Sequence, residues 1–172
     1  MKINELVKKA KAGDKEALVQ LIMDKNEEYY KLAYIYTQNR EDALDALEDT
    51  IVILYKKIKT LKKEEAFYSW SKTILVNKCK DLLRKRKKVI HLGKREILDE
   101  KDIIGKREEA MDLEQALRKL NRHQQEAIKL RYYMDYDYQS IAKITNAPLG
   151  TVKSRIFTGI EKLKVVLGGG KR

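Results

Sequence analysis

Residues 145–158 read TNAPLGTVKSRIFT and contain the single proline of the chain, Pro148. Proline has no N–H to donate inside a helix, and it suits the residues at which a helix begins. Asn146, two residues earlier, tolerates the left-handed backbone of a tight turn. The stretch therefore predicts the turn and the second helix of a helix-turn-helix unit.

The helix expected after Pro148 has two different faces. Its apolar residues Val152, Ile156, Ile160 and Leu163 recur every three or four positions and predict a buried stripe. The residues outside that stripe are the candidates for contacting bases or phosphates in a major groove: Thr151, Lys153, Ser154, Arg155, Phe157, Thr158 and Lys162. Arg155 adjoins Ile156, so it is interpreted either as a clamp on the DNA backbone or as a partner in an internal salt bridge.

The composition predicts an all-α fold. One proline and eight glycines in 172 residues leave few of the turns that an all-β domain needs, while 43% hydrophobic and 37% charged residues fit amphipathic helices. Residues 89–108 contain Gly93 and Gly105, mixed charges and no sustained apolar stripe. We therefore expect two small helical domains, residues 1–88 and 109–167, joined by a flexible linker over 89–108, with a flexible tail over 168–172.

The positive charge is divided between the two expected domains. Residues 1–88 contain 21 Lys and Arg against 14 Asp and Glu, residues 109–172 contain 12 against 7, and residues 89–108 are balanced. The formal net charge of +12 attracts polyanions, either nucleic acid or an anionic membrane surface. Charge alone does not choose between the two.

Several classes of protein are disfavoured by what the sequence lacks. No apolar run reaches the length of a membrane-spanning helix, and the first residues resemble no signal peptide, so a cytoplasmic location is predicted. Cys79, His91 and His123 are too few for a zinc site. There is also no glycine-rich phosphate loop, paired acid/base pocket or Ser/His/Asp set, which predicts a protein without catalysis, metal or cofactor.

An acidic helix is expected after Asn39. Its apolar stripe comprises Leu44, Leu47, Ile51, Leu54 and Ile58, and its opposite face carries Asp42, Asp45 and Asp49, with Glu48 beside them. The helix dipole explains acids in the first turn, such as Asp42. It explains Asp45, Glu48 and Asp49 less well, which leaves a partner-binding acidic patch as the alternative.

A further helix is expected from about Ala66 to Lys88. Its apolar side contains Phe67, Trp70, Ile74, Leu75, Cys79, Leu82 and Leu83. Another face aligns Asn77, Asp81, Arg84 and Lys88, and the helix ends in the run RKRKK over 84–88. Five consecutive bases exceed what a helix C-terminus gains from its dipole, so this end predicts a face that follows phosphates. Trp70 is either a core residue or a platform on which a base stacks.

Five segments in this order resemble the extracytoplasmic-function group of bacterial RNA polymerase sigma factors. They are GDKEALVQLI (13–22), REDALDALEDTIVILYKKI (40–58), FYSWSKTILVNKCKDLLRKRKK (67–88), LNRHQQEAIKLRYY (120–133) and YDYQSIAKITNAPLGTVKSRIFTGIEKLK (136–164). The resemblance covers nearly the whole chain. It implies a subunit that binds core RNA polymerase, through the β′ clamp helices and the β subunit, and binds promoter DNA.

The resemblance also assigns residues to each task. It implies polymerase binding by Asp42, Asp45, Glu48 and Asp49, although the family usually has glutamine at position 48 and an acid at position 44. It implies that the loop from Thr60 to Phe67 captures a flipped base, and that −10 recognition involves Lys62, Lys63, Trp70, Asn77, Lys78, Asp81, Arg84, Lys85 and Lys88. Lys153, Ser154, Phe157 and Thr158 would lie nearest the −35 bases. Thr158 and Ser140 depart from a frequently basic and a commonly acidic position.

The function predicted from these residues and from the resemblance is promoter recognition at −35 and −10 and the initiation of transcription. The resemblance further implies an anti-sigma factor, membrane-anchored, that holds the protein inactive. The alternative is an autonomous helix-turn-helix repressor or activator, which would bind duplex DNA tightly and specifically without polymerase.

Overall fold

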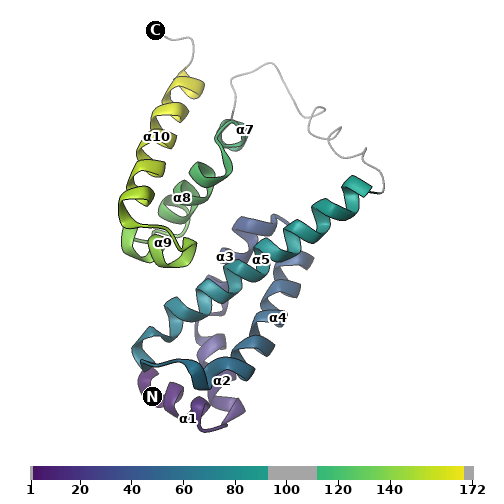
Figure 1. Cartoon of the computed structure of the whole chain (residues 1–172), viewed down its shortest axis with the longest axis vertical. Coiled ribbons are helices and arrows are strands. Elements are labelled where there is room, and N and C mark those ends of the chain that lie inside the picture. The colour runs from purple at the N-terminus through teal and green to yellow at the C-terminus, as the bar shows by residue number, and fades with distance from the viewer. Residues whose placement is uncertain (1, 93–111, 169–172) are drawn as a thin grey trace. The chain divides into compact units, whose positions relative to one another are not determined.

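A computed structural model describes residues 2–92 and 112–168 (Figure 1). The regular elements in these ranges are all helices, which confirms the predicted all-α class. They form two compact units, whose described parts are residues 2–83 with 142–146, and residues 84–92, 112–141 and 147–168. The domain boundaries expected at 88, 108 and 167 stay predictions. Within the described parts of the chain, no helix combines the length and the apolar character needed to cross a membrane.

Helices α2 and α4 of the first unit begin at recognisable side-chain caps. The Asp14 side chain accepts hydrogen bonds from the backbone N–H groups of Glu16 and Ala17 at 3.0 and 3.1 Å, and Asn39 accepts one from Asp42 at 2.9 Å. The elements in chain order are α1 (Ile3–Lys11), α2 (Lys15–Asp24), α3 (Asn26–Thr37), α4 (Arg40–Lys57), the 3₁₀ turns η1 (Ile58–Thr60) and η2 (Glu64–Ala66), and α5 (Phe67–Leu92).

A buried polar contact joins α3 and α5 in the core of this unit. The Tyr29 hydroxyl on α3 and Ser71 Oγ on α5 lie 2.6 Å apart, with both side chains buried. Burial raises the pKa of Tyr29 above its usual value. The surrounding core consists of fully buried apolar side chains, among them Leu21, Leu32, Leu54, Phe67, Leu75 and Val76. Because the pair satisfies both hydroxyls, α3 and α5 meet without an unpaired polar group at this contact.

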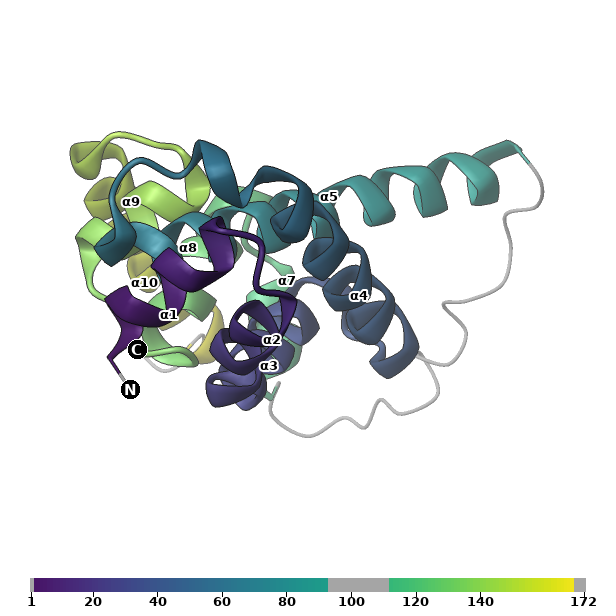
Figure 2. The same ribbon diagram turned by 90° about the horizontal axis from the view of Figure 1, so that it is seen from below.

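Helix α5 continues farther than expected. It ends at Leu92, four residues beyond Lys88, so the first four positions of the predicted linker are helical. Residues 84–90 are all exposed, and Figure 2 shows α5 as one continuous helix up to its end. No helix breaker precedes Gly93, which explains the extension. The rest of the predicted linker, 93–108, lies outside the described residues.

The apolar face of α4 also differs from the expectation. Leu44 is 37% exposed, and the buried side of the helix consists of Asp42, Ala43, Ala46, Leu47, Thr50 and Leu54. The placement of Asp42 on the polar face was therefore wrong, because its side chain is only 6% exposed. Small residues explain the shift in register: Ala43 and Ala46 are fully buried where α4 packs on α3. A count of large apolar residues alone overlooks such a surface.

Residues 112–168 contain α7 (Leu113–Arg118), α8 (Arg122–Tyr132), α9 (Tyr138–Thr145) and α10 (Leu149–Gly168). Asn121 caps α8 and forms a capping box with Gln124. Leu117, Leu120 and Ile128 form the core cluster, and Ile160 and Leu163 of α10 pack against it. This packing fixes the side of α10 that is turned away from solvent.

The turn before α10 has the predicted geometry. Asn146 has a positive φ of 56°, and the Val152 N–H donates to the Pro148 carbonyl at 3.1 Å, so Pro148 stands directly before the first turn of the helix. Val152 and Ile156 are buried, as the stripe predicts. The helix runs to Gly168, and residues 169–172 of the predicted tail lie outside the described residues.

Candidate functional site

The N-terminal half of α10 presents most of its predicted DNA contacts to solvent. Lys153, Ser154, Phe157, Thr158 and Lys162 are exposed, Phe157 by 65%, while Thr151 and Arg155 are half-buried. On a helix, positions three or four apart are neighbours, so 151, 154, 158 and 162 form one row and 153 and 157 a second. The two rows place cationic, hydroxyl and aromatic groups on one surface, which is the chemistry that reads base edges.

Lys153 is held by an aromatic ring from the preceding helix. Its Nζ lies 5.9 Å from the ring centroid of Tyr138, the first residue of α9. The Arg131 guanidinium lies 5.0 Å from the same ring and donates to the Tyr136 carbonyl at 3.0 Å. Such cation–π contacts restrict where a long cationic side chain points. Tyr138 and Arg131 were not among the residues predicted from the sequence, because they lie 15 and 22 positions before Lys153 and no local pattern pairs them with it.

Thr158 is engaged within the protein. Its hydroxyl donates to the Ser154 carbonyl at 2.9 Å and accepts from Gln124 Nε2 at 3.2 Å. Gln124 belongs to α8, so this bond joins the two helices at their crossing. Contact with DNA by Thr158 stays a prediction. In the structure, the Thr158 hydroxyl links α10 to α8.

In the second unit a buried lysine forms an ion pair with a partly exposed glutamate. Lys129 of α8 is 5% exposed, and its Nζ lies 3.8 Å from a carboxylate oxygen of Glu114 on α7. Burial lowers the pKa of Lys129, and the Glu114 charge opposes that shift. The pair links α7 to α8, and Gln124 and Ile128 of α8 lie against α10.

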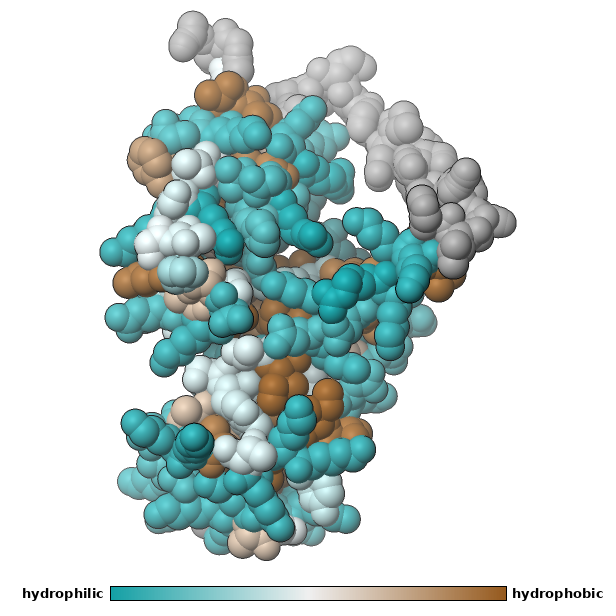
Figure 3. All heavy atoms as spheres, in the orientation of Figure 1, coloured by the Kyte–Doolittle hydropathy of each residue, from teal (hydrophilic) through white to brown (hydrophobic). Residues whose placement is uncertain are grey.

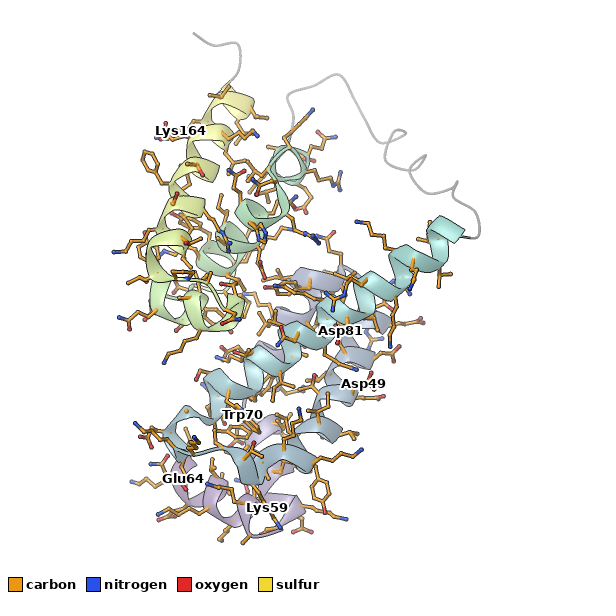
Figure 4. All side chains as sticks on the ribbon, in the orientation of Figure 1. Asp49, Lys59, Glu64, Trp70, Asp81 and Lys164 are labelled. Carbon is orange, nitrogen blue, oxygen red and sulfur yellow. The ribbon has the colours of Figure 1, made fainter. Side chains whose placement is uncertain are left out.

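The predicted −10 residues of α5 lie along one side of the helix. Trp70, Asn77, Asp81, Arg84 and Lys88 are spaced to form one row about 27 Å long, and Lys78 and Lys85 lie beside it. Asn77, Arg84, Lys85 and Lys88 are exposed, whereas Lys78 and Asp81 are half-buried. Figure 4 shows Trp70 and Asp81 on successive parts of this helix. The row thus becomes more exposed and more basic toward the C-terminus of α5.

Trp70 lies partly in the core and partly at the surface, so its position fits both a core residue and a platform for base stacking. Its side chain is half-buried, and its ring centroid lies 6.0 Å from that of the fully buried Phe67. One part of the ring therefore joins the core of the first unit, and another part reaches solvent. The geometry supports a fixed aromatic surface beside the loop that precedes α5.

That loop, residues 60–67, is anchored at both ends and in the middle. Leu61 and Phe67 are buried, and Lys62 and Lys63 are exposed between them. The Lys11 ammonium of α1 donates to the Leu61 carbonyl at 2.6 Å and lies 3.6 Å from a carboxylate oxygen of Glu64. The pKa of Glu64 is lowered, first by a hydrogen bond from its own backbone N–H and also by the nearby Lys11 charge. Lys11 was absent from the sequence-based candidates.

The exposed face of α4 is both acidic and apolar. Asp45, Glu48 and Asp49 are exposed, and Figure 4 shows Asp49 on this helix. Their exposed neighbours on the same helix are Leu44, Val52 and Tyr55, at 37%, 52% and 46%. Figure 3 shows that hydrophilic residues cover most of the visible face of each unit, with apolar residues between them. An apolar centre with a polar rim is the arrangement found in protein-binding surfaces.

Two family models match the chain, one on each side of the predicted linker. The model of sigma-70 region 2 matches residues 21–89, which include α4, the loop and most of α5. The model of sigma-70 region 4 matches residues 110–163, which include the helix-turn-helix. Together they contain all the candidate residues of the sequence analysis.

Similar proteins of known identity span nearly the same length. RNA polymerase sigma factor SigV of Bacillus subtilis is 32% identical over 165 residues, which cover 92% of this chain and 96% of that protein. ECF RNA polymerase sigma factor SigM of Mycobacterium tuberculosis is 29% identical over 164 residues, covering 95% of this chain and 84% of that protein.

Solved structures share the fold. CnrH, in complex with the cytosolic domain of CnrY, matches with a TM-score of 0.71 and 20% identity over 98% of this chain and 99% of that one. The sigma factor RpoE of Bartonella quintana, in complex with the anti-sigma factor NepR, matches with a TM-score of 0.68 and 23% identity over 88% and 97%. With both region models and SigV matched in one chain, this protein belongs to the extracytoplasmic-function group of sigma-70 family RNA polymerase sigma factors.

Proposed function

We propose that the protein is a dissociable specificity subunit whose first unit docks on the β′ clamp helices of core polymerase and opens the −10 element, while its second unit reads the −35 element. The observation that carries this proposal is the match to regions 2 and 4 in one chain, each with an exposed basic surface. No catalytic step is assigned to it.

At the −35 element, α10 would enter the major groove with its N-terminal half. Lys153 can donate to guanine acceptors, Ser154 can donate or accept, and the exposed ring of Phe157 can press against a thymine methyl group. Arg155 is half-buried, which suits a contact with the adjacent phosphates. The turn at Pro148 starts the helix where these side chains meet the bases.

At the −10 element, the loop over 60–67 and α5 would act together. A base read as a single strand must leave the stack at a cost of a few kcal/mol, which a shaped pocket and aromatic stacking offset. Lys62 and Lys63 can hold the backbone at the pocket, and the exposed edge of Trp70 offers a stacking surface. The basic end of α5, with Arg84, Lys85 and Lys88, would follow the phosphates beyond it.

On core polymerase, the exposed face of α4 is the proposed contact with β′. Asp45, Glu48 and Asp49 supply a negative surface, and Leu44 and Val52 supply apolar area inside it. Charge complementarity would speed the encounter and the apolar residues would contribute affinity. Asp42, also predicted to bind polymerase, is buried and offers a partner little surface.

The division into two basic units explains how modest contacts give a specific complex. Each unit binds phosphates at its own element, and polymerase holds both at a high effective concentration near the DNA. A subunit with such surfaces must be kept from binding polymerase and DNA when its promoters are not to be transcribed. We propose an anti-sigma factor, membrane-anchored, that covers them; the complexes of CnrH with CnrY and of RpoE with NepR support this proposal.

In vitro transcription with core polymerase and a library of genomic fragments tests the proposed function. The protein should direct initiation at defined sites that share two separated sequence elements. Initiation no more specific than that of core polymerase alone would refute it. Tight, specific binding of the protein to duplex DNA without polymerase would favour the autonomous helix-turn-helix alternative.

Asp45→Ala combined with Asp49→Ala tests the polymerase surface. The double variant should keep its helicity and lose affinity for core polymerase in a co-purification titration. Glu16→Ala with Glu27→Ala removes the same charge from exposed positions of α2 and α3 and serves as the matched control. Equal binding by the two double variants would contradict the assignment to α4.

Lys153→Ala tests base reading at −35. It should lower transcription from the identified promoters and lose most of that effect when the −35 sequence is scrambled. The same loss on both templates would identify Lys153 as a phosphate contact only.

A further inference from the structure

We propose that Lys11 of α1 is a positioning residue for −10 recognition: its ammonium clamps the loop at Leu61 and Glu64 and so presents Lys62 and Lys63 to the single strand. This inference rests on the proposed function of the loop. Lys11 lies outside the matched region 2 segment, which begins at residue 21.

The geometry of the clamp is specific. Lys11 Nζ donates to the Leu61 carbonyl at 2.6 Å and lies 3.6 Å from Glu64 Oε2, so one ammonium holds two points of the loop. The two points lie on either side of Lys62 and Lys63. The bond to Leu61 has a charged donor and is therefore stronger than a bond between neutral groups, whereas the contact with Glu64 is an ion pair.

The environment of the clamp favours a fixed arrangement. The side chains of Lys11 and Glu64 are only 24% and 25% exposed, and α1 packs against both η1 and η2. The Leu61 side chain is buried, so the residue that offers the carbonyl cannot swing into solvent. A half-buried ion pair is also less screened by salt than a surface pair.

A clamp at this place matters because of what the loop has to do. Capture of an unstacked base is costly, and a loop that must also become ordered on binding adds to that cost. A loop that is already ordered before binding avoids this entropic cost, so its contacts with the strand add fully to the affinity. Lys11 therefore acts through the loop, and its own ammonium is turned toward the protein, where it neutralises Glu64.

The test compares Lys11→Met with Lys9→Met. Methionine keeps a straight side chain and removes the charge, and Lys9 is an exposed lysine on the same helix, so the two variants have equal net charge. Holoenzyme is reconstituted with each variant and titrated against a fluorescent single-stranded oligonucleotide carrying the non-template −10 sequence found by transcription. Lys11→Met should weaken binding about tenfold and Lys9→Met by less than about twofold.

The dependence on salt separates positioning from direct contact. Loss of one phosphate contact lowers the slope of log K against log salt by about 0.7 for a single strand. Lys62→Met should show that reduced slope, whereas Lys11→Met should keep the wild-type slope. Glu64→Gln should weaken binding less than Lys11→Met, since the Leu61 bond remains, and should add nothing to Lys11→Met.

Two outcomes overturn the inference while the proposed function stands. The first is that Lys11→Met binds the single strand with wild-type affinity. The second is that its salt slope is reduced as in Lys62→Met. Both count only if the wild-type holoenzyme prefers the −10 strand to a scrambled one. If the wild-type holoenzyme shows no such preference, the proposed −10 function itself fails and the inference fails with it. Unfolding of the Lys11→Met protein in urea at the wild-type midpoint confirms that the clamp, and not the fold, has been changed.

Discussion

Gly159 is a point of close contact between α10 and α8, and Gly159→Ala tests that contact. A Cβ at this position would lie 2.6 Å from Ile128 Cδ1 and 3.4 Å from Gln124 Cβ, both on α8. Carbon atoms pack best at about 3.5 to 4.0 Å. Either the Ile128 side chain or the whole of α10 must therefore move by about 1 Å to admit one methyl group.

Two opposing effects set the expected magnitude. Overpacking of a core costs about 1 to 3 kcal/mol, and replacing glycine with alanine inside a helix gains about 1 kcal/mol. We expect a net loss of about 1 kcal/mol for Gly159→Ala. Gly150 lies on the same helix with no atom within 4 Å of an added Cβ, so Gly150→Ala should gain up to about 1 kcal/mol and serves as the control.

Urea unfolding measured in two ways provides the assay. Far-UV circular dichroism follows all helices, whereas fluorescence follows Trp70, the single tryptophan, which belongs to the first unit. Gly159→Ala should move the circular dichroism transition to lower urea and leave the Trp70 transition in place. Ile128→Val, which removes the Cδ1 atom, should recover stability in the Gly159→Ala background. Equal stabilisation by the two glycine substitutions would refute the close contact.

Three further outcomes are expected. Tyr138→Leu should weaken −35 binding by the holoenzyme about three- to fivefold, whereas Tyr138→Phe should not. Neither substitution should change binding in a Lys153→Ala background. Equal losses for Leu and Phe would contradict the cation–π contact. Ser71→Ala should cost about 1 to 3 kcal/mol in urea unfolding followed by Trp fluorescence, because the Tyr29 hydroxyl loses its partner, and adding Tyr29→Phe should recover part of that loss. Burial raises the pKa of Cys79 from 9.0 to about 12, so at pH 8 its reactive thiolate is about a thousandfold scarcer than in the unfolded chain. Iodoacetamide should therefore modify Cys79 readily only in urea, and labelling of the native protein at the unfolded rate would contradict its burial.

Local patterns predicted the helices and several of their ends correctly. Asn39 caps the helix that it was expected to begin, and Asn146 has the positive φ of the predicted turn. These features depend on hydrogen bonds and backbone preferences within a few residues, which the sequence displays directly. The exposed face of α10 follows in the same way from the buried stripe that includes Val152 and Ile156.

Patterns of large apolar residues were a poorer guide where small residues make the contact. On α4 the alanines at 43 and 46 are buried and Leu44 is not, so Asp42 lies on the inner side. On α10 the buried glycine at 159 escaped notice for the same reason. Close packing of two helices selects small side chains, which hydrophobicity alone ranks low.

The sequence by itself determined the helical class, the helix-turn-helix, the two separate basic segments and the side chains that face solvent on α10. Only the tertiary structure decided which groups hold those side chains: Tyr138 beneath Lys153, Gln124 against Thr158, and Lys11 across the loop at Leu61. The physical reason is that periodicity reports what each helix turns inward, whereas a contact between residues 15, 34 or 50 positions apart depends on how the helices pack.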